Sequence, residues 1–414
     1  MPSRLPILSV ADVRQHVEER CFAPSPDLRV GIEVESLTFP ADPASRVTAD
    51  ELELLRAEAG PLPGGGSITF EPGGQVEISS LPHRTIAGAC DAVSADMSVI
   101  RDAASSHGIA LRQLGADPLR SDHRVLDAPR YVSMESYFDH GGMAGRKMMC
   151  GTAAVHVNVG VGSSAASVGR RWRLAHLLGP LLAGAFANSP VVEGRPSGWR
   201  SSRLAAWMSI DGSRTAPACR GDDHAGDWWR YVLDAGLMLI RSEDRFVPLA
   251  PGFSFGRWMS DGHALGFPDR DDLEYHLSTL FPPVRPKGWL ELRMIDSLPE
   301  PWWRVPAAVG AALLDDEEAS EAAFAAAGPS AGMWADAARH GLRHPVLAES
   351  AKRCFLAAQA ALARVGADRS TTDVVGEYFD RWVARGRVPA DDLLESWTKT
   401  GSVLDLSPQE AAWT

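Results

Sequence analysis

Val30-Gly-Ile-Glu-Val-Glu35 alternates apolar and acidic residues, and this stretch decides the fold class that we predict. Successive side chains of a β-strand point to opposite faces of its sheet. Ile32 and Val34 therefore lie on one face, and Glu33 and Glu35 lie on the other. The stretch predicts a strand with one face in a hydrophobic core and one acidic face.

Three further segments repeat this alternation. They are Ile68-Thr-Phe-Glu71, continued after the Pro72-Gly73-Gly74 turn by Gln75-Val-Glu-Ile78, then Ala154-Val-His-Val-Asn-Val159, and Leu290-Glu-Leu-Arg-Met-Ile295. Their polar positions hold acids, amides, one histidine and one arginine but no lysine, and are Glu71, Gln75, Glu77, His156, Asn158, Glu291 and Arg293. A solvated sheet face usually mixes Lys, Thr, Ser and Glu, so the composition of these positions indicates a functional surface.

The polar positions of the four segments together supply five glutamates. Any one segment alone is better explained as an amphipathic strand with its polar face in water, because one-sided antiparallel sheets are common. Five carboxylates on one surface would repel one another unless cations held them. Mg²⁺ prefers oxygen ligands and typically pairs a few carboxylates with substrate phosphates. The combined pattern predicts a multi-metal nucleotide site.

The remaining sequence mixes helical and extended patterns. Residues 9–23, 85–107 and 168–187 are predicted to be helices, residues 28–80 to be strands and turns, and residues 109–114 to be a further strand. This order indicates an α+β fold rather than a regular βαβ series.

The later part of the chain differs in composition. Residues 188–262 are rich in Gly, Pro, Trp and Arg and are predicted to form loops that line a site. Within them, residues 251–262 are predicted to form either a mobile flap or a structural loop. Beyond Pro306 the chain is Ala-rich and helical, so we expect a catalytic core over residues 1–305 and a helical C-terminal region over residues 306–414 packed on it.

The overall composition excludes several classes of protein. The 414 residues include 53 acidic and 41 basic ones, a formal net charge of −12, which argues against a broad nucleic-acid-binding surface. Five scattered cysteines without a C-x-x-C pair are typical of reduced thiols in the cytoplasm. The N-terminus lacks the apolar stretch of a signal peptide, and the run 174–187 is too short to cross a bilayer. We expect a cytoplasmic protein that binds neither nucleic acid nor membrane, and no P-loop motif is present.

A basic segment forms the second candidate site. Arg195 and Arg200 precede Arg203 and Trp207, and the last three are spaced to share one face if the segment is helical. Such a face could hold a substrate carboxylate through bidentate arginine contacts. A surface helix with solvated arginines explains the spacing equally well.

Several motifs together resemble a known family. In chain order they are Gly31-Ile-Glu-Val-Glu35, Phe70-Glu-Pro-Gly-Gly-Gln-Val-Glu77, Met148-Met-Cys-Gly-Thr-Ala-Ala-Val155, Asn188-Ser-Pro190, Trp199-Arg-Ser-Ser-Arg203 and Leu290-Glu-Leu-Arg-Met-Ile-Asp296. The ordered set resembles the glutamate–cysteine ligases of the plant and bacterial type, from about residue 29 to 398. The segments 281–289 and 342–353 are most similar to the actinobacterial branch, which makes γ-glutamylcysteine for ergothioneine synthesis.

The resemblance implies a glutamine-synthetase-like fold with a curved, mainly antiparallel sheet, surrounding helices and a helical C-terminal region. It implies that two or three Mg²⁺ ions, with Mn²⁺ as an alternative, bind Glu33, Glu35, Glu71, Glu77 and Glu291. The branch is expected to carry Gln where this chain has His156, so a metal-ligand role for His156 stays open. The resemblance further implies that Arg293 and Glu291 act in catalysis, and that the substrates are bound by Arg203, Arg195, Arg200, Trp207, Asn158 and Gln75.

The implied reaction uses ATP as co-substrate and proceeds through γ-glutamyl phosphate. The side-chain carboxylate of L-glutamate attacks the γ-phosphorus of ATP, and the amine of L-cysteine then displaces phosphate. Three alternatives remain at this point: a ligase with another amine acceptor, a metal-dependent phosphohydrolase, and a non-catalytic binding protein. We expect only small-molecule partners and a monomer or weak homo-oligomer.

Overall fold

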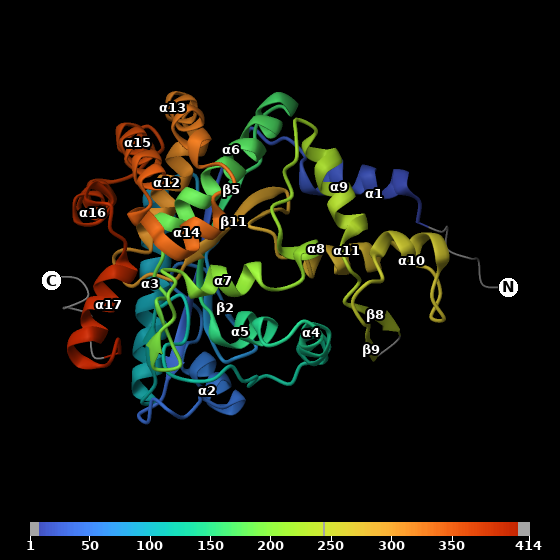
Figure 1. Ribbon diagram of the computed structural model, residues 1–414, viewed down its shortest axis with the longest axis horizontal. Coiled ribbons are helices and arrows are strands. Elements are labelled where there is room, and N and C mark those ends of the chain that lie inside the picture. Colours follow the sequence, from blue (N-terminus) through green and yellow to red (C-terminus); the bar gives the residue numbers. More distant parts are fainter. Residues whose placement is uncertain (1–7, 243–244, 405–414) are drawn as a thin grey trace.

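The structure is a computed structural model that describes residues 8–242 and 245–404. Antiparallel strands form its centre (Figure 1). Within these residues the main sheet has seven strands in the order β10-β11-β5-β1-β3-β2, with β4 also paired to β1. The strands are β1 (Val30–Phe39), β2 (Ser67–Phe70), β3 (Val76–Ser79), β4 (Ala110–Arg112), β5 (Ala154–Gly160), β10 (Val284–Pro286) and β11 (Trp289–Asp296). All four predicted alternating segments belong to this one sheet, which confirms the prediction of a mainly antiparallel α+β fold.

The register of the sheet brings its polar residues together across neighbouring strands. Glu33 on β1 pairs with His156 on β5, and Glu35 pairs with Glu77 on β3. On the other side of β5, Asn158 pairs with Glu291 of β11. Because paired residues point to the same face, the polar positions of four strands form one continuous surface.

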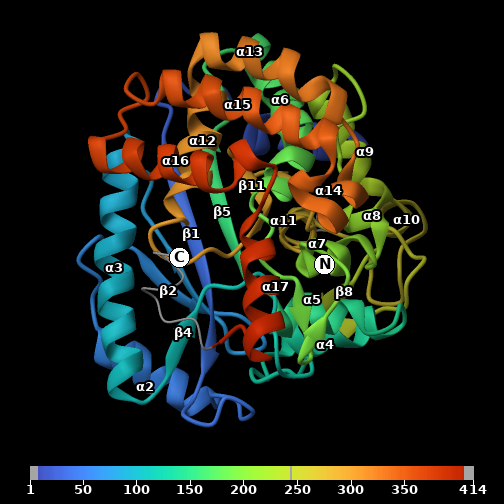
Figure 2. The same ribbon diagram turned by 60° about the vertical axis from the view of Figure 1, so that its left-hand side comes forward.

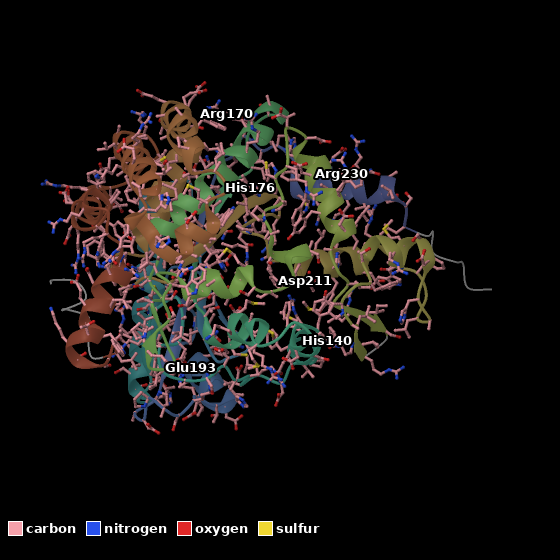
Figure 3. The ribbon with its side chains drawn as sticks, in the orientation of Figure 1. His140, Arg170, His176, Glu193, Asp211 and Arg230 are labelled. Carbon is pink, nitrogen blue, oxygen red and sulfur yellow. The ribbon has the colours of Figure 1, made fainter. Side chains whose placement is uncertain are left out.

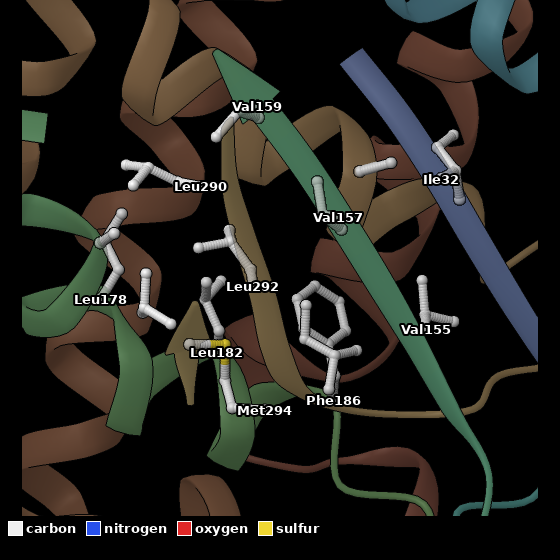
Figure 4. Packing of buried hydrophobic residues seen from close by; sticks show 14 of the residues in the cluster. Ile32, Val155, Val157, Val159, Leu178, Leu182, Phe186, Leu290, Leu292 and Met294 are labelled. Carbon is white, nitrogen blue, oxygen red and sulfur yellow. The ribbon is translucent and has the colours of Figure 1, made fainter. Parts of the chain in front are cut away.

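The opposite face of the sheet carries the hydrophobic core. Val157 of β5 and Leu292 of β11 pack with Leu182 and Phe186 at the end of helix α6 (Ala165–Ala185) in Figure 4. Both strand residues are fully buried. Burying an apolar face of this kind contributes roughly 1.5–3 kcal/mol per large side chain. The predicted buried face of the alternating segments is therefore confirmed.

Helices enclose the sheet. The first set comprises α1 (Val10–His16, continued by a π-helical turn over Val17–Cys21), α2 (Ala49–Ala59), α3 (Ile86–Ser106), α4 (Pro129–Asp139), α5 (Ala144–Gly151), α7 (Ser202–Met208), α8 (Gly212–Thr215), α9 (His224–Asp234), α10 (Phe255–Asp261) and α11 (Arg270–Ser278). Two short hairpins accompany them, β6–β7 (Val191–Val192, Arg195–Pro196) and β8–β9 (Leu239–Ser242, Arg245–Pro248). Helix α3 packs against β1 and β3, and Figure 2 shows it beside β1. The three helices and the short strand predicted before residue 188 are confirmed.

The C-terminal part is helical, as predicted. Its helices are α12 (Arg304–Asp315), α13 (Glu317–Ala327), α14 (Trp334–His340), α15 (Pro345–Ala361), α16 (Arg369–Arg381) and α17 (Pro389–Thr400). Helices α12, α13, α14 and α15 pack against α6, whereas α1 and α10 lie on the opposite side of the molecule (Figure 1). One hydrophobic core includes residues of both parts, and the boundary near residue 305 stays a prediction. None of the helices in the described ranges is long and apolar enough to cross a membrane.

Two sequence predictions differ from the structure. Residues 28–80 contain helix α2, which begins with a capping box between Thr48 and Glu51 and follows the strand signals of β1. Residues 188–262 contain four helices rather than loops alone. The segment predicted as a flap or loop forms α10, which is capped by Ser254 and packs on α9. Helices α2 and α9 do carry apolar residues at helical spacing, Leu52, Leu55 and Ala59 in α2 and Trp228, Tyr231 and Val232 in α9, so the signal was present in the sequence and was overlooked.

Candidate active site

A cleft of about 800 Å³ lies over the polar face of the sheet. Strands β1, β3 and β11 contribute many of its acidic and basic residues, while α4, α5 and the segment around Phe281 contribute apolar ones. The predicted site residues that line it are Glu33, Glu35, Glu71, Gln75, Glu77, His156, Trp207, Glu291 and Arg293. Most of the polar residues picked out by strand alternation thus meet in one cavity.

Four glutamates in this cleft form what we call the carboxylate cluster: Glu33, Glu35, Glu71 and Glu77. Ligand atoms of Glu33, Glu77 and His156 lie within 4.8 Å of one another. The Nδ1 atom of His156 lies 2.8 Å from Glu33 Oε2, whereas its buried Nε2 has no hydrogen-bond partner among the described residues. Carboxylate oxygens and an unpartnered imidazole nitrogen are a donor set that fits a divalent cation such as Mg²⁺ or Mn²⁺.

The ionisation of the carboxylate cluster also fits a bound cation. Burial, with repulsion from Glu71 and Glu33, raises the pKa of Glu77 to about 7. Burial likewise raises the pKa of Glu71 and raises that of Glu35 well above its ordinary value. Burial and then the nearby Arg293 lower the pKa of His156 to about 4, so its ring is neutral at pH 7. Arg293, Arg203 and Arg130 offset the negative charge of Glu35 and Glu71 only in part, and a divalent cation would stabilise the ionised carboxylates further.

The turn between β2 and β3 places Glu71, a member of the carboxylate cluster, and Gln75. Glu71 closes the turn by accepting a backbone hydrogen bond from Gly74, and Glu71 N donates to Gln75 O. At Gly73 a Cβ atom would come within 2.1 Å of the Cys150 carbonyl oxygen, so only glycine lets the turn pack this closely on α5. Gln75 itself is buried and donates to the Thr152 carbonyl at 2.8 Å. Its contact is with the backbone of the cleft wall.

Glu291 lies in a different electrostatic setting. It accepts hydrogen bonds from Arg285 Nε at 2.6 Å, from Arg293 Nη1 at 3.0 Å and from Lys287 Nζ at 3.4 Å. Burial opposes its ionisation, but Arg285, Arg293 and Lys287 hold the pKa of Glu291 well below its ordinary value. We call these four residues the basic cluster. Three cations around one carboxylate leave a net positive charge that favours an anionic ligand.

An apolar surface closes one side of the cleft. It consists of Met134 from α4, Met148 and Met149 from α5, and Phe281, and we call it the methionine wall. Trp207 Nε1 donates to the Phe281 carbonyl at 3.1 Å, which fixes the indole beside this wall.

Arg130 and Tyr131, at the start of α4, also line the cleft. Arg130 Nη2 donates to the Ser278 carbonyl at 3.0 Å, while its buried Nε has no partner in the described ranges. Arg130 is therefore a cation of the cleft that retains an unused donor.

The structure does not bring all the predicted arginines to the cleft. Arg195 is exposed in β7, and Arg200 Nε donates to Asp391 of α17 at 2.7 Å. Arg200 also precedes the helix, because Ser201 is the N-cap of α7. Arg203 is buried beneath the cleft, where its Nη2 donates to the Arg293 carbonyl at 2.7 Å. The prediction that Arg200 and Arg203 share one face of a helix is therefore wrong.

Asn158 likewise lies beside the cleft rather than in its lining. Its Nδ2 donates to Glu33 Oε1 at 2.9 Å, and its Oδ1 accepts from Trp289 Nε1 at 2.9 Å. Both ends of the amide are therefore engaged by protein groups.

Sequence reasoning missed the basic residues beside Glu291. Arg285 and Lys287 flank Pro286, and their two-residue spacing is the same signal that picked out Glu291 and Arg293. A three-residue strand was too short for alternation to stand out. Arg130 has no such signal, because it begins a helix and reaches the cleft only through the placement of α4.

Three other ionisable groups, two outside the cleft and one in its lining, are not candidates for a catalytic role. Asp211, labelled in Figure 3, accepts a hydrogen bond from Tyr137 at 2.6 Å and one from Arg214 at 3.2 Å. His176 is buried in α6, where burial lowers its pKa to about 4. Cys21 lines the cleft, but burial raises the pKa of its thiol to about 12, so it is protonated at pH 7.

Comparisons with known proteins give a consistent result. The sequence model described as Glutamate-cysteine ligase family 2 (GCS2) matches residues 29–409. Glutamate–cysteine ligase EgtA of Mycobacterium tuberculosis H37Rv is 39% identical over 407 residues, which is 95% of this chain and 91% of that protein. The EgtA of Mycolicibacterium smegmatis is 40% identical over 393 residues, with 93% and 91% covered. The chloroplastic glutamate–cysteine ligase of Arabidopsis thaliana is 29% identical over 405 residues, with 89% and 76% covered.

Solved structures share the fold at low sequence identity. Glutamate–cysteine ligase of Francisella tularensis, solved in complex with AMP, has a TM-score of 0.57 at 13% identity, with 94% of this chain and 89% of that chain covered. A bifunctional glutathione synthetase from Pasteurella multocida has a TM-score of 0.54 at 16% identity, with 93% and 52% covered. The match to the family over residues 29–409 and the identity to the two mycobacterial relatives show that this chain belongs to glutamate–cysteine ligase family 2.

Proposed function

We propose that this protein is an ATP-dependent glutamate–cysteine ligase that forms γ-glutamylcysteine, ADP and phosphate. The observation that carries the proposal is the pairing, in one cleft, of a carboxylate cluster with a basic cluster. The first suits divalent cations and the second suits the phosphates of a nucleotide. The family and the relatives named above support the choice of glutamate and cysteine as substrates.

The two clusters of the cleft have different roles in the proposed reaction. Glu33, Glu35, Glu71, Glu77 and His156 would hold two or three Mg²⁺ or Mn²⁺ ions, which would supply positive charge near the phosphates. Arg285, Lys287 and Arg293 bind the phosphates of ATP, and Glu291 keeps these three side chains in a fixed arrangement. Such preorganised charge is the main source of catalysis in phosphoryl transfer.

The bond changes follow from these contacts. The γ-carboxylate of glutamate attacks the γ-phosphorus of ATP, which breaks the bond to ADP and forms γ-glutamyl phosphate. The amine of cysteine, once its ammonium group has lost a proton, then attacks the acyl carbon, phosphate leaves with the bonding electrons, and the nitrogen releases a second proton as the amide forms. Neither step needs a nucleophile of the protein, in agreement with the protonated state of Cys21.

The amino-acid substrates need a cation for an α-carboxylate and an apolar surface for a side chain. Arg130 offers a guanidinium with an unused Nε, and Met134 follows it by one helical turn in α4. The methionine wall is soft and apolar, which suits the thiol of cysteine. Arg203 stays a candidate for the carboxylate of glutamate, since its buried Nε also has no partner in the residues described.

ADP release with ATP, Mg²⁺ and glutamate, measured with and without cysteine, tests the proposal. We expect cysteine to stimulate ADP release and the product to have the mass of γ-glutamylcysteine. Stimulation by a different amine would identify another acceptor in the same mechanism. Hydrolysis of ATP independent of any acceptor would contradict the proposal in favour of a phosphohydrolase.

We further propose that the product enters ergothioneine biosynthesis in the cytoplasm. The identity to the two mycobacterial EgtA proteins supports this assignment. Deleting the gene should abolish ergothioneine, and added γ-glutamylcysteine should restore it. Normal ergothioneine in the deletion strain would contradict the assignment.

A further inference from the structure

Trp289 stands at the start of β11 on the same face of the sheet as Glu291 and Arg293. It is a large aromatic residue that is 39% exposed, beside a cleft whose proposed reaction gives it no role. Its Nε1 donates a hydrogen bond of 2.9 Å to Asn158 Oδ1. The Nζ of Lys287 lies 5.1 Å from the centre of its ring.

Asn158 connects Trp289 to the carboxylate cluster by a second hydrogen bond. Its Nδ2 donates to Glu33 Oε1 at 2.9 Å, while His156 Nδ1 lies 2.8 Å from Glu33 Oε2. Each oxygen of Glu33 therefore has one protein partner, and the plane of the carboxylate is held from both sides. One further lone pair on each oxygen remains for a cation.

The indole decides which way the Asn158 amide points. A tryptophan Nε1–H can only donate, so it can contact the oxygen of the amide but never its NH₂ group. With the oxygen turned toward Trp289, the NH₂ group must face Glu33. Without the indole N–H the amide could rotate and present its oxygen to Glu33, and two acceptors would then repel each other.

We propose that Trp289 is a positioning residue that acts through Asn158 to orient Glu33 for a divalent cation. The inference rests on the proposed function, because it takes Glu33 as a ligand. Outer partners that hold metal ligands usually affect metal affinity about 10- to 100-fold when they are changed. Asn158 belongs to this class, and Trp289 lies one hydrogen bond further from Glu33, so we expect its effect at the lower end of that range.

Binding of Mn²⁺ to the full chain without nucleotide, followed by electron paramagnetic resonance, tests the inference. We expect Trp289→Phe, which keeps an aromatic ring but removes the donor, to weaken Mn²⁺ binding about tenfold. Trp229→Phe is the matched control, because Trp229 is also partly exposed with a cation, Arg230, 4.8 Å from its ring centre. Trp229 lies on α9, and Figure 3 labels its neighbour Arg230. The control should bind Mn²⁺ like the unchanged protein.

A double-mutant cycle tests whether Trp289 affects Mn²⁺ binding through its hydrogen bond to Asn158 or through its ring contact with Lys287. Asn158→Leu removes the relay, so adding Trp289→Phe to it should cause no further loss of Mn²⁺ affinity. If the losses of Mn²⁺ affinity in the two single variants add up in the double variant, the inference is wrong. It is also wrong if Trp289→Phe keeps both the Mn²⁺ affinity and the melting temperature of the unchanged protein. Absence of any Mn²⁺ binding by the unchanged protein would overturn it too.

The same measurements distinguish this inference from the proposed function. If the unchanged protein ligates no amino acid but Trp289→Phe weakens Mn²⁺ binding as expected, the positioning role stands and the proposed reaction fails. If ligation is confirmed while Mn²⁺ affinity does not depend on Trp289, the reaction stands and the positioning role fails.

Discussion

The carboxylate cluster and the basic cluster occupy one cleft on one face of one sheet, yet their charges are balanced in opposite ways. Among the residues that the structure describes, Glu77 accepts hydrogen bonds from hydroxyl groups alone, Thr69 at 2.7 Å and Ser79 at 3.0 Å, and its pKa is raised to about 7. Glu291 is surrounded by three cations, and its pKa is lowered. The comparison teaches that alternation along a strand selects residues for a site but does not assign their roles. Neighbours across the sheet assign them.

The largest expected effect is on catalysis by the carboxylate cluster. Glu77→Gln should lower kcat/KM for ligation on the order of 10³-fold, because one proposed cation ligand is lost, and several kcal/mol of charge stabilisation with it. Glu33→Gln and Glu35→Gln should behave similarly. The melting temperature of Glu77→Gln should stay the same or rise, since a repelled carboxylate is removed. Near-normal ligation with the usual Mg²⁺ dependence would contradict the assignment.

The matching change in the basic cluster should act on stability. Glu291→Gln leaves Arg285 and Arg293 buried without their counter-charge, and we expect a loss of about 3 kcal/mol in the free energy of unfolding. Urea denaturation of this variant beside Glu77→Gln measures the contrast. Equal stability of the two variants would show that the two clusters do not differ as the structure indicates.

A smaller effect is expected where a cation of the basic cluster is removed. Arg285→Ala should raise the KM for ATP about tenfold, the loss expected for one hydrogen bond to a charged group. Arg195→Ala is the control, because its side chain is exposed in β7 and the KM for ATP and for glutamate should not change. A rise in KM for glutamate in Arg195→Ala would restore the role predicted from the sequence.

A further effect is expected on the pH dependence of stability. The folded-state pKa of Glu77, about 7, lies above its unfolded value, so the folded protein binds more protons between these two values. Without metal, the stability that Glu77 contributes should be present at low pH and fall as the pH rises toward 7. Melting temperatures in chelator and in Mg²⁺ across this range measure the effect. Mg²⁺ should reverse the fall, and Glu77→Gln should flatten it.

Much of the fold could be predicted because its signals are local. Alternation in β1, β5 and β11 depends only on neighbouring residues, and the long helices α3 and α6 have strong apolar patterns. The same local signals identified most of the acidic residues that line the cleft. Alternation also missed two cleft cations, Arg285 and Lys287, because β10 has only three residues.

Contacts between distant segments could not be predicted from these signals. Arg200 and Arg203 have the spacing of one helix face, but Ser201 begins the helix between them. Arg200 then pairs with Asp391, which lies 191 residues away along the chain. Arg130 reaches the cleft only because α4 packs beside α5. The spacing of residues along the chain does not show which distant segments pack together.

The sequence by itself determined that one sheet has an apolar face and an acidic face, because side-chain direction in a strand alternates with every residue. It also determined the family, through motifs that keep their order along the chain. Only the tertiary structure decided that Glu291 belongs with Arg285 and that Asn158 links Trp289 to Glu33. The physical reason is that register and packing set the distances between charges, and these distances determine which carboxylate is neutralised and which is left for a cation.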